Sequence, residues 1–356
     1  MKKKILVDLS ILKHINCGLG QVAYNYGKYF QEHYSSNPKF DLYLLLPKKM
    51  VGLFGSKINY IAANWLQRLF PFLLPKFDVW HAIHQLSHYQ PAYKSTKLIL
   101  TIHDFNFLYE KSESKAKKYL RKVQCEIRRA DKIICISNFS KSEAERFASI
   151  EGKTIDIIYN GVEQFDLNGA EKPDFLQNSK PFFFSIGQIK KKKNFHVLLQ
   201  LMKLCPENEL YIAGNRKTAY AEEMLATIEA EQIPNVHLVG EITNSERIWL
   251  YNECKAFLYP SLFEGFGLPV IEAMYFGKPV FTTEETSLKE IGGGLTYIWN
   301  NFEPHYMKNV LTNGLTTFYA SPFHREQVID YAKSFSYDKH MKEYIKVYTQ
   351  LLNNQN

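Results

Sequence analysis

The stretch AFLYPSLFEGFGLPVIEAMYFGKPV, residues 256–280, decides the fold expected for this chain. It begins as a short apolar strand, breaks at Pro260 and crosses a glycine-rich turn before it enters a helix. Pro269 fits the first helical turn, where its missing N–H leaves no hydrogen bond unmade. Gly277, Lys278 and Pro279 end the helix ahead of a second strand. Strand, turn, helix and strand in this order predict an α/β protein.

The glycine-rich turn predicts a binding site for an anion. Gly265 and Gly267 carry no Cβ, so a ligand can approach their backbone closely. The N–H groups of Phe266, Gly267 and Leu268 are expected to point outward, with the positive end of the helix dipole behind them. A diphosphate group is the anion that we expect at this position.

Two carboxylates bracket the turn. Glu264 precedes the glycines and Glu272 lies about one turn inside the helix. Carboxylates accept paired hydrogen bonds from sugar hydroxyls, so a nucleotide-sugar suits the site, with its hexose near Glu264 and its ribose near Glu272. Taken alone, the two residues would be a solvated loop glutamate and a helix-surface glutamate. Their place in EGFGLPVIEAM between two strands favours the binding site.

The spacing Glu264-x7-Glu272 within PSLFEGFGLPVIEAMYFGKPV resembles the motif of the family 4 glycosyltransferases, retaining enzymes of the GT-B architecture. The resemblance implies an α/β fold of two Rossmann-like domains that face each other across a cleft, with a C-terminal helix crossing back to the first domain. We expect residues 1–167, together with the helix 337–356, to form the N-terminal acceptor-side domain. Residues 168–336 are then the C-terminal domain that binds the nucleotide-sugar.

Length and composition agree with two globular domains. The chain has 356 residues, of which 46% are hydrophobic and 22% are charged. No apolar run approaches the ~18 residues of a membrane span. The start MKKKILVDLS has the basic and apolar parts of a signal peptide, but Asp8 interrupts the apolar part and favours a buried strand. The five cysteines, Cys17 among them, are scattered without a C-x-x-C pair, which indicates reduced thiols in a cytoplasm.

The net charge of +8 is unevenly distributed. Residues 1–175 contain 26 Lys and Arg against 17 Asp and Glu, about +9, whereas the remainder contains 18 against 19, about −1. A basic first half could meet an anionic membrane surface, an acidic acceptor or nucleic acid. We favour the membrane surface and expect no nucleic acid, because the basic residues lack the interleaved aromatics of a single-strand platform.

Apolar, β-branched-rich runs alternate with helical stretches in the first half and predict a parallel sheet covered on both faces. The runs lie at residues 5–9, 41–47, 79–83, 97–104, 132–137 and 156–160. After the first run, Gly18 and Gly20 open a helix. They lie too far beyond the strand for a dinucleotide fingerprint. A loop over phosphate or sugar, as the resemblance implies, and a plain turn at a helix start both fit.

Two segments of the first half could contact an anionic membrane. Residues 53–76 place apolar side chains at helical spacing, including Trp65 and Leu69, with Lys57, Arg68 and Lys76 at the edges. A basic amphipathic helix with tryptophan can lie in a bilayer interface, and an ordinary helix covering the sheet explains the pattern equally well. The basic helix of residues 111–132 adds to the membrane interpretation, although a solvated surface helix is the usual reason for such a charge run.

His103 follows the strand KLILTI, at the end of the strand where ligands of parallel sheets bind. The family resemblance implies that a histidine here reaches the donor sugar and that Asp104 holds the loop; otherwise a lone histidine at a strand end is structural. His81, His84 and His88 have no cysteine or carboxylate at ligand spacing, so no metal site is expected.

The polar segment 166–181 has no periodicity and is interpreted as a linker, after which the strand 181–187 restarts the strand–helix alternation. Gly187 ends this strand ahead of a lysine-rich loop. The family places a lysine at the end of this loop, and Lys193 matches it. An arginine often follows the glycine in the family, but Gln188 stands there, which leaves Lys192 or Arg216 as possible second cations for a diphosphate.

We therefore expect a metal-independent transferase that moves a hexose from a nucleoside-diphosphate sugar to a hydroxyl with retention, and that needs no cofactor. Glu264, His103 and Lys193 are the candidate catalytic residues. GDP-mannose is the favoured donor and a glycan or lipid-linked bacterial surface glycan the favoured acceptor, with the protein at the inner face of the membrane. A sugar-nucleotide epimerase or hydrolase of the same architecture is the main alternative; a dehydrogenase or a nucleic-acid-binding protein is less favoured.

Overall fold

A computed structural model describes residues 2–15, 18–34, 39–176 and 180–353. The chain divides into two compact units: unit 1 contains Met1–Glu163 and Ser336–Asn356, and unit 2 contains Gln164–Phe335. The domain boundaries predicted from the sequence, 167/168 and 336/337, lie four residues and one residue after the boundaries between the two units. Cys17, residues 177–179 of the expected linker and residues 354–356 of the expected last helix lie outside the described residues.

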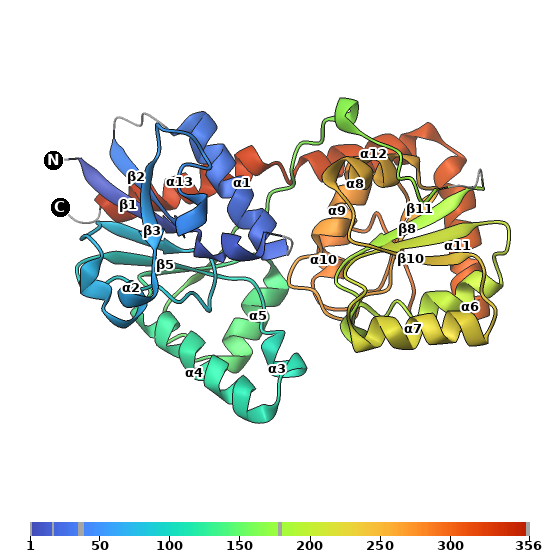
Figure 1. The fold of residues 1–356 in the computed structure, drawn as a ribbon, viewed down its shortest axis with the longest axis horizontal. Helices are drawn as coiled ribbons and strands as arrows, with labels where there is room; N and C mark the ends of the chain where they lie inside the picture. Colours follow the sequence, from blue (N-terminus) through green and yellow to red (C-terminus); the bar gives the residue numbers. More distant parts are fainter. Residues whose placement is uncertain (1, 16–17, 35–38, 177–179, 354–356) are drawn as a thin grey trace. The chain divides into compact units, whose positions relative to one another are not determined.

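Unit 1 is built on a seven-stranded sheet with the order β3-β2-β1-β4-β5-β6-β7, and all its pairings are parallel (Figure 1). The strands are β1 (Lys3–Asp8), β2 (Phe40–Pro47), β3 (Asn59–Ala63), β4 (Val79–Ala82), β5 (Lys97–Ile102), β6 (Lys132–Cys135) and β7 (Ile155–Ile157). The predicted alternation of strands and helices, and the parallel sheet, are confirmed.

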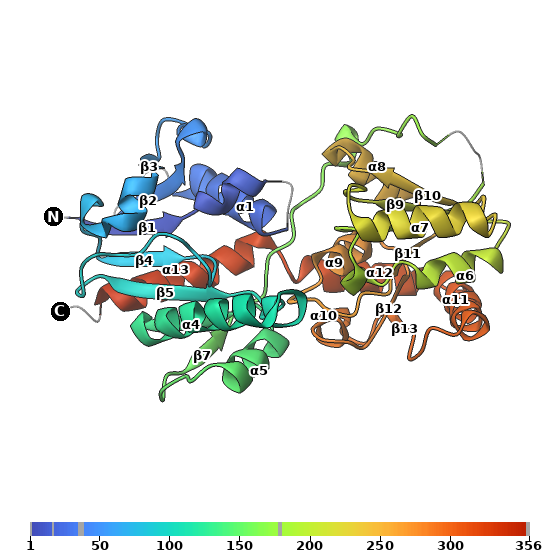
Figure 2. The same cartoon turned by 60° about the horizontal axis from the view of Figure 1, so that its bottom comes forward.

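Alternate side chains of these strands face two layers of helices, because successive residues of a strand point to opposite faces. On one face Trp80 and Leu100 pack with Val123 and Ile127 of α4 (Glu113–Arg129), which lies along β5 (Figure 2). α5 (Asn138–Phe147) and the short α3 (Phe107–Glu110) belong to the same side. On the other face lie α1 (Gly18–His33) and α13 (Tyr337–Asn353).

α13 is the predicted C-terminal helix that returns to the first domain. His81 of β4 binds Tyr348 of α13 at 2.7 Å, and Thr101 of β5 binds Tyr344 at 2.9 Å. The chain enters α13 beside the end of the first half, where Ser336 forms a parallel bridge with Val162. Buried hydrogen bonds of this kind fix the helix in one position on the sheet, since each unmade bond would cost free energy.

The expected amphipathic helix over residues 53–76 is wrong. Residues 59–63 form the edge strand β3, and only Trp65–Leu69 form a helix, α2. A 3-10 turn, η3 (Pro71–Leu73), follows it. Asn64 caps α2 and Pro71 cannot continue it, so the helix is one turn long. Two further 3-10 turns of unit 1 are η1 (Ser10–His14) and η2 (Lys48–Met50).

Unit 2 has a six-stranded parallel sheet with the order β10-β9-β8-β11-β12-β13. Its strands are β8 (Phe182–Ile186), β9 (Glu209–Ala213), β10 (Val236–Gly240), β11 (Ala256–Tyr259), β12 (Val280–Thr282) and β13 (Tyr297–Ile298). Its helices are α6 (Val197–Lys203), α7 (Ala219–Ala230), α8 (Asn244–Glu253), α9 (Leu268–Tyr275), α10 (Leu288–Gly292), α11 (Pro304–Tyr319) and α12 (Pro322–Lys333), with 3-10 turns η4 (Leu167–Gly169) and η5 (Lys191–Lys193).

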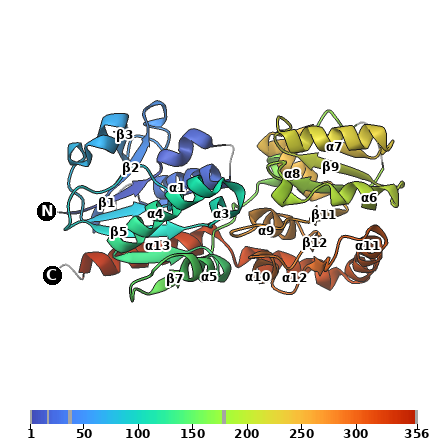
Figure 3. The ribbon, with the colours of Figure 1, turned by 90° about the horizontal axis from the view of Figure 1, so that it is seen from below.

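α12 packs against α9, the helix of the opening motif (Figure 3). The polar segment interpreted as a linker joins unit 2 rather than standing between the units: the N–H of Glu171 donates to the Ser245 carbonyl at 3.2 Å, and the Ser245 hydroxyl donates to the Glu171 carboxylate at 3.1 Å. None of the helices in the described ranges combines the length and apolar character that a membrane span requires.

Candidate active site

The strand order of unit 2 defines where a ligand is expected. From β8 the chain proceeds through β9 to β10 at one edge of the sheet. It then returns to β11, which pairs with β8 on the opposite side from β9. The loops that leave β8 and β11 at their carboxyl ends therefore diverge, and such a switch point is where open α/β sheets bind ligands. The lysine-rich loop follows β8 and the EGFG turn follows β11, so the two sequence motifs lie at one switch point.

Lys193 and Glu264 form a buried ion pair at this switch point. The side chains are 10% and 13% exposed, and the Lys193 ammonium contacts Glu264 Oε1. The same ammonium donates to the Tyr259 hydroxyl at 2.5 Å. Glu264 Oε1 also accepts from the Tyr259 hydroxyl at 2.7 Å and from Ser261 Oγ at 2.6 Å. A lysine from the loop after β8 and a carboxylate from the loop after β11 are thus brought together, as the sequence analysis expected of their loops.

The carboxyl group of Glu264 is held ionised. Burial by itself would raise the pKa of Glu264, but the charge of Lys193 and hydrogen bonds from Lys193 and Ser261 outweigh burial and leave the pKa below its ordinary value. Burial, followed by the charge of Glu264, raises the pKa of Tyr259 well above its ordinary value, so this phenol remains a hydrogen-bond donor. The site therefore offers a fixed carboxylate and a fixed ammonium side by side.

Gly187 allows the lysine to reach this position. A Cβ at Gly187 would lie 3.3 Å from Cε of Lys193, and a Cβ at Gly214 would lie 1.9 Å from the Gly187 carbonyl oxygen. A side chain at Gly214 would separate the loops after β8 and β9, because no Cβ tolerates a backbone atom that close, whereas a Cβ at Gly187 would crowd only the Lys193 side chain. The role of Gly187 here is close packing of backbone against Lys193.

The EGFG turn is held by hydroxyl groups that the sequence analysis missed. The N–H of Glu264 donates to Thr286 Oγ1 at 3.0 Å. Ser287 Oγ lies 2.9 Å from the carbonyl oxygens of both Glu264 and Phe266, and its one hydroxyl hydrogen is shared between them. Thr283 donates to the Ser261 carbonyl at 2.7 Å. The signal for them was the run TEETS (283–287) directly after β12, which ends beside β11 at the same sheet edge.

The turn leads into α9 as the sequence predicted. Gly267 is the N-cap residue with φ of 99°, a left-handed conformation that glycine adopts without strain. A Cβ there would lie 2.7 Å from Leu288 Cδ2. No side chain caps α9, and its first turn carries no acidic residue. Phe266 is buried beside Phe335, with ring centroids 6.0 Å apart, which fixes the turn on the protein.

Glu272 on α9 is engaged by two residues of α8. Arg247 Nη1 lies 3.3 Å from Glu272 Oε1, and the Tyr251 hydroxyl donates to Oε2 at 2.9 Å. The Arg247 guanidinium also lies 5.3 Å from the ring centroid of Phe165. Arg247 and Tyr251 are four residues apart and so share one face of α8. The sequence shows this spacing, but it does not show that this face meets α9.

The two candidate second cations lie in different surroundings. The carbonyl of Lys192 accepts from the N–H of Leu262 at 2.8 Å, so its backbone joins the two loops of the switch point. Arg216 donates from Nη1 to the Leu238 carbonyl at 3.1 Å, against the edge strand β10. Arg216 follows β9, the neighbour of β8 in the sheet, and its contact with a diphosphate stays a prediction.

In unit 1, Gly18 and Gly20 form the first turn of α1. Gly18 has open space around it, whereas a Cβ at Gly20 would lie 2.2 Å from the His14 carbonyl oxygen. Gly20 is thus needed so that α1 can start close to η1, and Gly18 is not needed for packing.

Replacement of Gly20 by alanine is expected to lower the free energy of unfolding of unit 1 by about 1–3 kcal/mol, because η1 or α1 must shift to admit the methyl group. Urea unfolding of the full chain measures this. Gly18→Ala is the matched control on the same turn and should leave stability unchanged or slightly higher. Equal effects of both changes would contradict the packing role of Gly20.

His103 directly follows β5 in unit 1, whereas Lys193 and Glu264 belong to unit 2. Its ring Nε2 lies 2.8 Å from the Ile83 carbonyl, so Nε2 carries the proton and Nδ1 is an acceptor. Burial lowers the pKa of His103 to about 4, although the bond to Ile83 acts in the opposite direction, and the ring is neutral at physiological pH. Asp104 Oδ1 accepts from the N–H of Asn106 at 3.0 Å and holds the loop. Contact of His103 with a sugar stays a prediction.

The other histidines near this sheet edge have structural surroundings. His81 lies between Tyr348 and Thr101, and burial lowers the pKa of His84 to about 3. In the described ranges no three His, Cys, Asp or Glu side chains come together in a way that could hold a metal ion.

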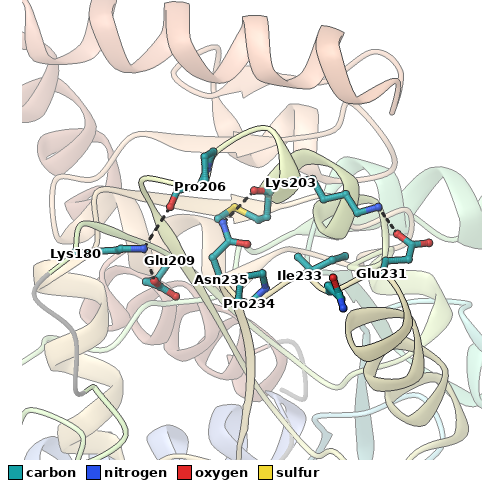
Figure 4. A pocket seen from close by; sticks show the side chains of 10 residues that line it. Lys180, Lys203, Pro206, Glu209, Glu231, Ile233, Pro234 and Asn235 are labelled. Carbon is teal, nitrogen blue, oxygen red and sulfur yellow. Dashed lines mark hydrogen bonds and ion pairs between the residues drawn. The ribbon is translucent and has the colours of Figure 1, made fainter.

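A pocket of about 240 Å3 lies at the other end of the unit 2 sheet (Figure 4). It is lined by residues at the amino ends of the strands, including Glu209 at the start of β9 and Asn235 just before β10. Its charged side chains pair with each other: Lys180 with Glu209 at 3.4 Å, and Lys203 with Glu231 at 2.6 Å. This pocket is separate from the switch point, where ligands of parallel sheets bind.

Comparison with known families explains the arrangement. Residues 170–296 match the family described as "Glycosyl transferases group 1", and residues 25–164 match "Glycosyltransferase Family 4". The chain belongs to the group 1, family 4 glycosyltransferases. The first match contains the Lys193–Glu264 pair and Glu272, and the second contains His103.

Several relatives of this glycosyltransferase are mannosyltransferases. The serotype-specific mannosyltransferase WbdA of Escherichia coli is 30% identical over 222 residues, which cover 58% of this chain but only 27% of WbdA. The O-antigen chain mannosyltransferase RfbU of Salmonella typhimurium is 25% identical over 238 residues, 65% of this chain and 63% of RfbU. The aligned region thus spans about a quarter of the first relative and under two thirds of the second.

Solved structures show the same fold over the whole glycosyltransferase chain. Sucrose-phosphate synthase of Thermosynechococcus elongatus aligns with a TM-score of 0.75 at 15% identity, covering 99% of this chain and 100% of that one. HepE of Anabaena, solved in complex with UDP and glucose, aligns with a TM-score of 0.75 at 16% identity, covering 98% and 100%. The expected fold class, two Rossmann-like units of the GT-B type with α13 returning to unit 1, is confirmed.

Proposed function

We propose that the protein transfers a hexose from a nucleoside-diphosphate sugar to a hydroxyl of a glycan or glycolipid acceptor, with retention of the anomeric configuration. The observation that carries this proposal is the buried Lys193–Glu264 pair at the switch point, directly ahead of the uncapped start of α9. Membership of the family and the GT-B fold support it.

The proposed chemistry follows from where charge develops. When the bond between the anomeric carbon and the diphosphate breaks, negative charge grows on the leaving phosphate. The Lys193 ammonium and the amino end of α9 would stabilise that charge. Glu264, held as a carboxylate, would accept hydrogen bonds from the hexose, and Glu272 would accept them from the ribose. His103, with its acceptor Nδ1, is our proposed contributor from unit 1.

The proposed reaction needs neither a metal nor a cofactor. The sequence contains no D-x-D, the motif with which single-domain transferases hold a divalent ion at the diphosphate. Two protein features, a lysine and a helix start, would replace such an ion. We propose that the leaving phosphate takes the acceptor proton, so that no separate protein base is required. Exclusion of water from the closed site would then suppress hydrolysis of the donor.

GDP-mannose is the proposed donor and a bacterial surface polysaccharide the proposed product, with the reaction on the cytoplasmic side of the membrane. The mannosyltransferases WbdA and RfbU support the sugar and the product class. HepE, with UDP and glucose, makes UDP-glucose the competing donor to compare.

A panel of UDP-, GDP- and ADP-sugars tests the donor through thermal unfolding. A donor present at about a hundred times its Kd should stabilise the folded chain by about 2.7 kcal/mol, and we expect GDP-mannose to give the largest shift. Glu272→Gln should reduce the shift, because a neutral amide accepts fewer hydrogen bonds from ribose hydroxyls. Glu253→Gln, on the exposed surface of α8, is the control.

Incubation of the stabilising donor with and without an acceptor then tests the reaction. Nuclear magnetic resonance of the product should show the same anomeric configuration as the donor. Free sugar or an epimer in the absence of acceptor would instead identify a hydrolase or epimerase, and stabilisation by no nucleotide-sugar would reject the proposed function.

A further inference from the structure

Exposed apolar side chains gather in one short part of unit 1. In the ranges that the structure describes, fifteen large apolar side chains are exposed, and eight of them lie between residues 51 and 73. These eight are Val51, Leu53, Trp65, Leu66, Leu69, Phe70, Phe72 and Leu73. Single exposed apolar residues are common on proteins, but a contiguous group marks a binding surface.

Six of the eight lie on α2 and η3 or between them, and the six together are the apolar segment, residues 65–73. No residue of α2 or η3 is buried. Trp65 and Phe72 are each 65% exposed and Leu69 is 63% exposed. Phe70 and Phe72 lie with ring centroids 5.8 Å apart, so the two turns present adjoining side chains.

The apolar segment is anchored at both ends. Asn64 and Gln67 form a reciprocal capping box with two bonds of 3.0 Å, and the Tyr89 hydroxyl donates to the Asn64 carbonyl at 3.3 Å. At the other end, Leu74 is only 2% exposed. The exposed side chains are therefore held out from the protein by a fixed backbone rather than by a loose loop.

In the sequence, only positive charges flank the apolar segment. Between Asp41 and Asp78 the sequence has no Asp or Glu, and it has the cations Lys48, Lys49, Lys57, Arg68 and Lys76. Asp41 and Asp78 are themselves paired with Lys2 and Lys3. A second copy of this surface would be repelled, because it carries the same charge. An anionic surface with an apolar interior is complementary to it.

We propose that the apolar segment docks on an anionic membrane surface, with its aromatic and leucine side chains in the interfacial layer and the flanking cations at lipid phosphates. α4 has a basic outer face, but no large apolar side chain of Glu113–Arg129 is exposed. α4 can therefore add charge at the surface but no apolar insertion, and contact of residues 111–132 with the membrane stays a prediction. The inference goes beyond the proposed function and depends on unit 1 alone.

Flotation with vesicles tests the inference. The full chain should float with vesicles of phosphatidylglycerol mixed with phosphatidylcholine, and much less with phosphatidylcholine alone or at high salt. Trp65 serves as a second readout: it is 65% exposed, whereas Trp80 and Trp299 are buried and Trp249 of unit 2 is half-buried, so a blue shift of the emission on vesicle binding should come mainly from Trp65. The double variant Leu69→Ser, Phe72→Ser should reduce partitioning by about tenfold or more, since two side chains lose their apolar burial.

Phe323→Ser is the matched control, because Phe323 of α12 in unit 2 is also 63% exposed. It should float like the wild type. Unchanged flotation of the double variant, or equal binding to neutral vesicles, would overturn the inference. A concentration-dependent dimer that the double variant abolishes, without vesicle binding, would assign the surface to a second copy and would also overturn it.

Thermal unfolding with nucleotide-sugar separates this inference from the proposed function. The double variant should keep the donor-induced shift of the wild type, because residues 65–73 are in unit 1 and the Lys193–Glu264 pair is in unit 2. Flotation without any donor-induced shift would reject the proposed function and leave membrane docking standing. A donor-induced shift without flotation would reject docking alone.

Discussion

Replacement of Lys193 by methionine is expected to abolish sugar transfer and to lower the free energy of unfolding by about 3–5 kcal/mol. The activity is lost because the leaving phosphate loses its ammonium partner. Stability is lost because Glu264 becomes an unpaired carboxylate whose side chain is only 13% exposed. Glu264→Gln should likewise lower both the transfer activity and the free energy of unfolding, since it leaves the Lys193 ammonium buried without a counter-charge.

The double variant Lys193→Met, Glu264→Gln separates the two effects. With both charges removed, most of the stability should return, because replacing a buried pair by neutral groups of similar volume is nearly neutral. Transfer should remain absent. Urea unfolding and a transfer assay on the four proteins complete the cycle.

Lys191→Met is the matched control in the same lysine run. Lys191 is 78% exposed and lies 3.7 Å from Glu223, so its loss should change stability by less than about 1 kcal/mol. Additive losses in the double variant would show that the buried pair is not coupled. Full transfer by Lys193→Met would place the active site elsewhere.

Replacement of His340 by asparagine is expected to make unit 1 less sensitive to acid. His340 is 4% exposed and joins α13 to the sheet and α1: Nδ1 lies 2.6 Å from the Tyr159 carbonyl and Nε2 lies 3.1 Å from the Tyr26 hydroxyl. The carbonyl can only accept, so Nδ1 carries the proton and Nε2 accepts from Tyr26. Burial lowers the pKa of His340 to about 4, although the bond to Tyr159 acts in the opposite direction.

The pH window follows from this shift. In the unfolded chain a histidine has a pKa of about 6.5. Above that pH neither state binds the proton, and the stabilising contribution of the neutral ring is complete. Between about pH 6.5 and pH 4 only the unfolded chain binds the proton, so the free energy of unfolding falls by up to ~1.4 kcal/mol per pH unit for this group.

The difference between the wild type and the variant in the pH dependence of the free energy of unfolding measures the contribution of His340. His84 and His103 have lowered pKa values in the same unit, and burial raises the pKa of Glu126 to about 7, which acts in the opposite direction with pH. These groups are common to both proteins, so the contributions of those that do not interact with His340 cancel in the difference; His103 interacts with His340, and its change belongs to the measured difference. Urea unfolding at several pH values between 7.5 and 4.5 should show the wild type losing the greater stability. Parallel pH profiles would contradict a buried, neutral His340.

Local patterns in the sequence were sufficient for the strand–helix alternation and for the motif around Glu264. Buried parallel strands are continuous apolar runs, and the glycines and Pro269 of the EGFG turn limit the backbone through local sterics. β3 was missed, because NYIAA is short and only partly buried on the edge of the sheet. The helix expected over residues 53–76 is wrong, because the spacing of apolar residues does not show the helix boundaries at Asn64 and Pro71.

Tertiary structure decided which of the candidate side chains meet and which further side chains hold them. Lys193 and Glu264 are 71 residues apart, and they meet because β8 and β11 are neighbours in the sheet. β12 lies next to β11 in the same sheet, which brings Thr286 and Ser287 to the EGFG turn. Hydrophobic periodicity determines that a segment is a strand, but strand order depends on how all helices and strands pack together. The sequence by itself therefore determined the loops after β8 and β11 and the carboxylates Glu264 and Glu272. The tertiary structure determined which side chains these carboxylates bind.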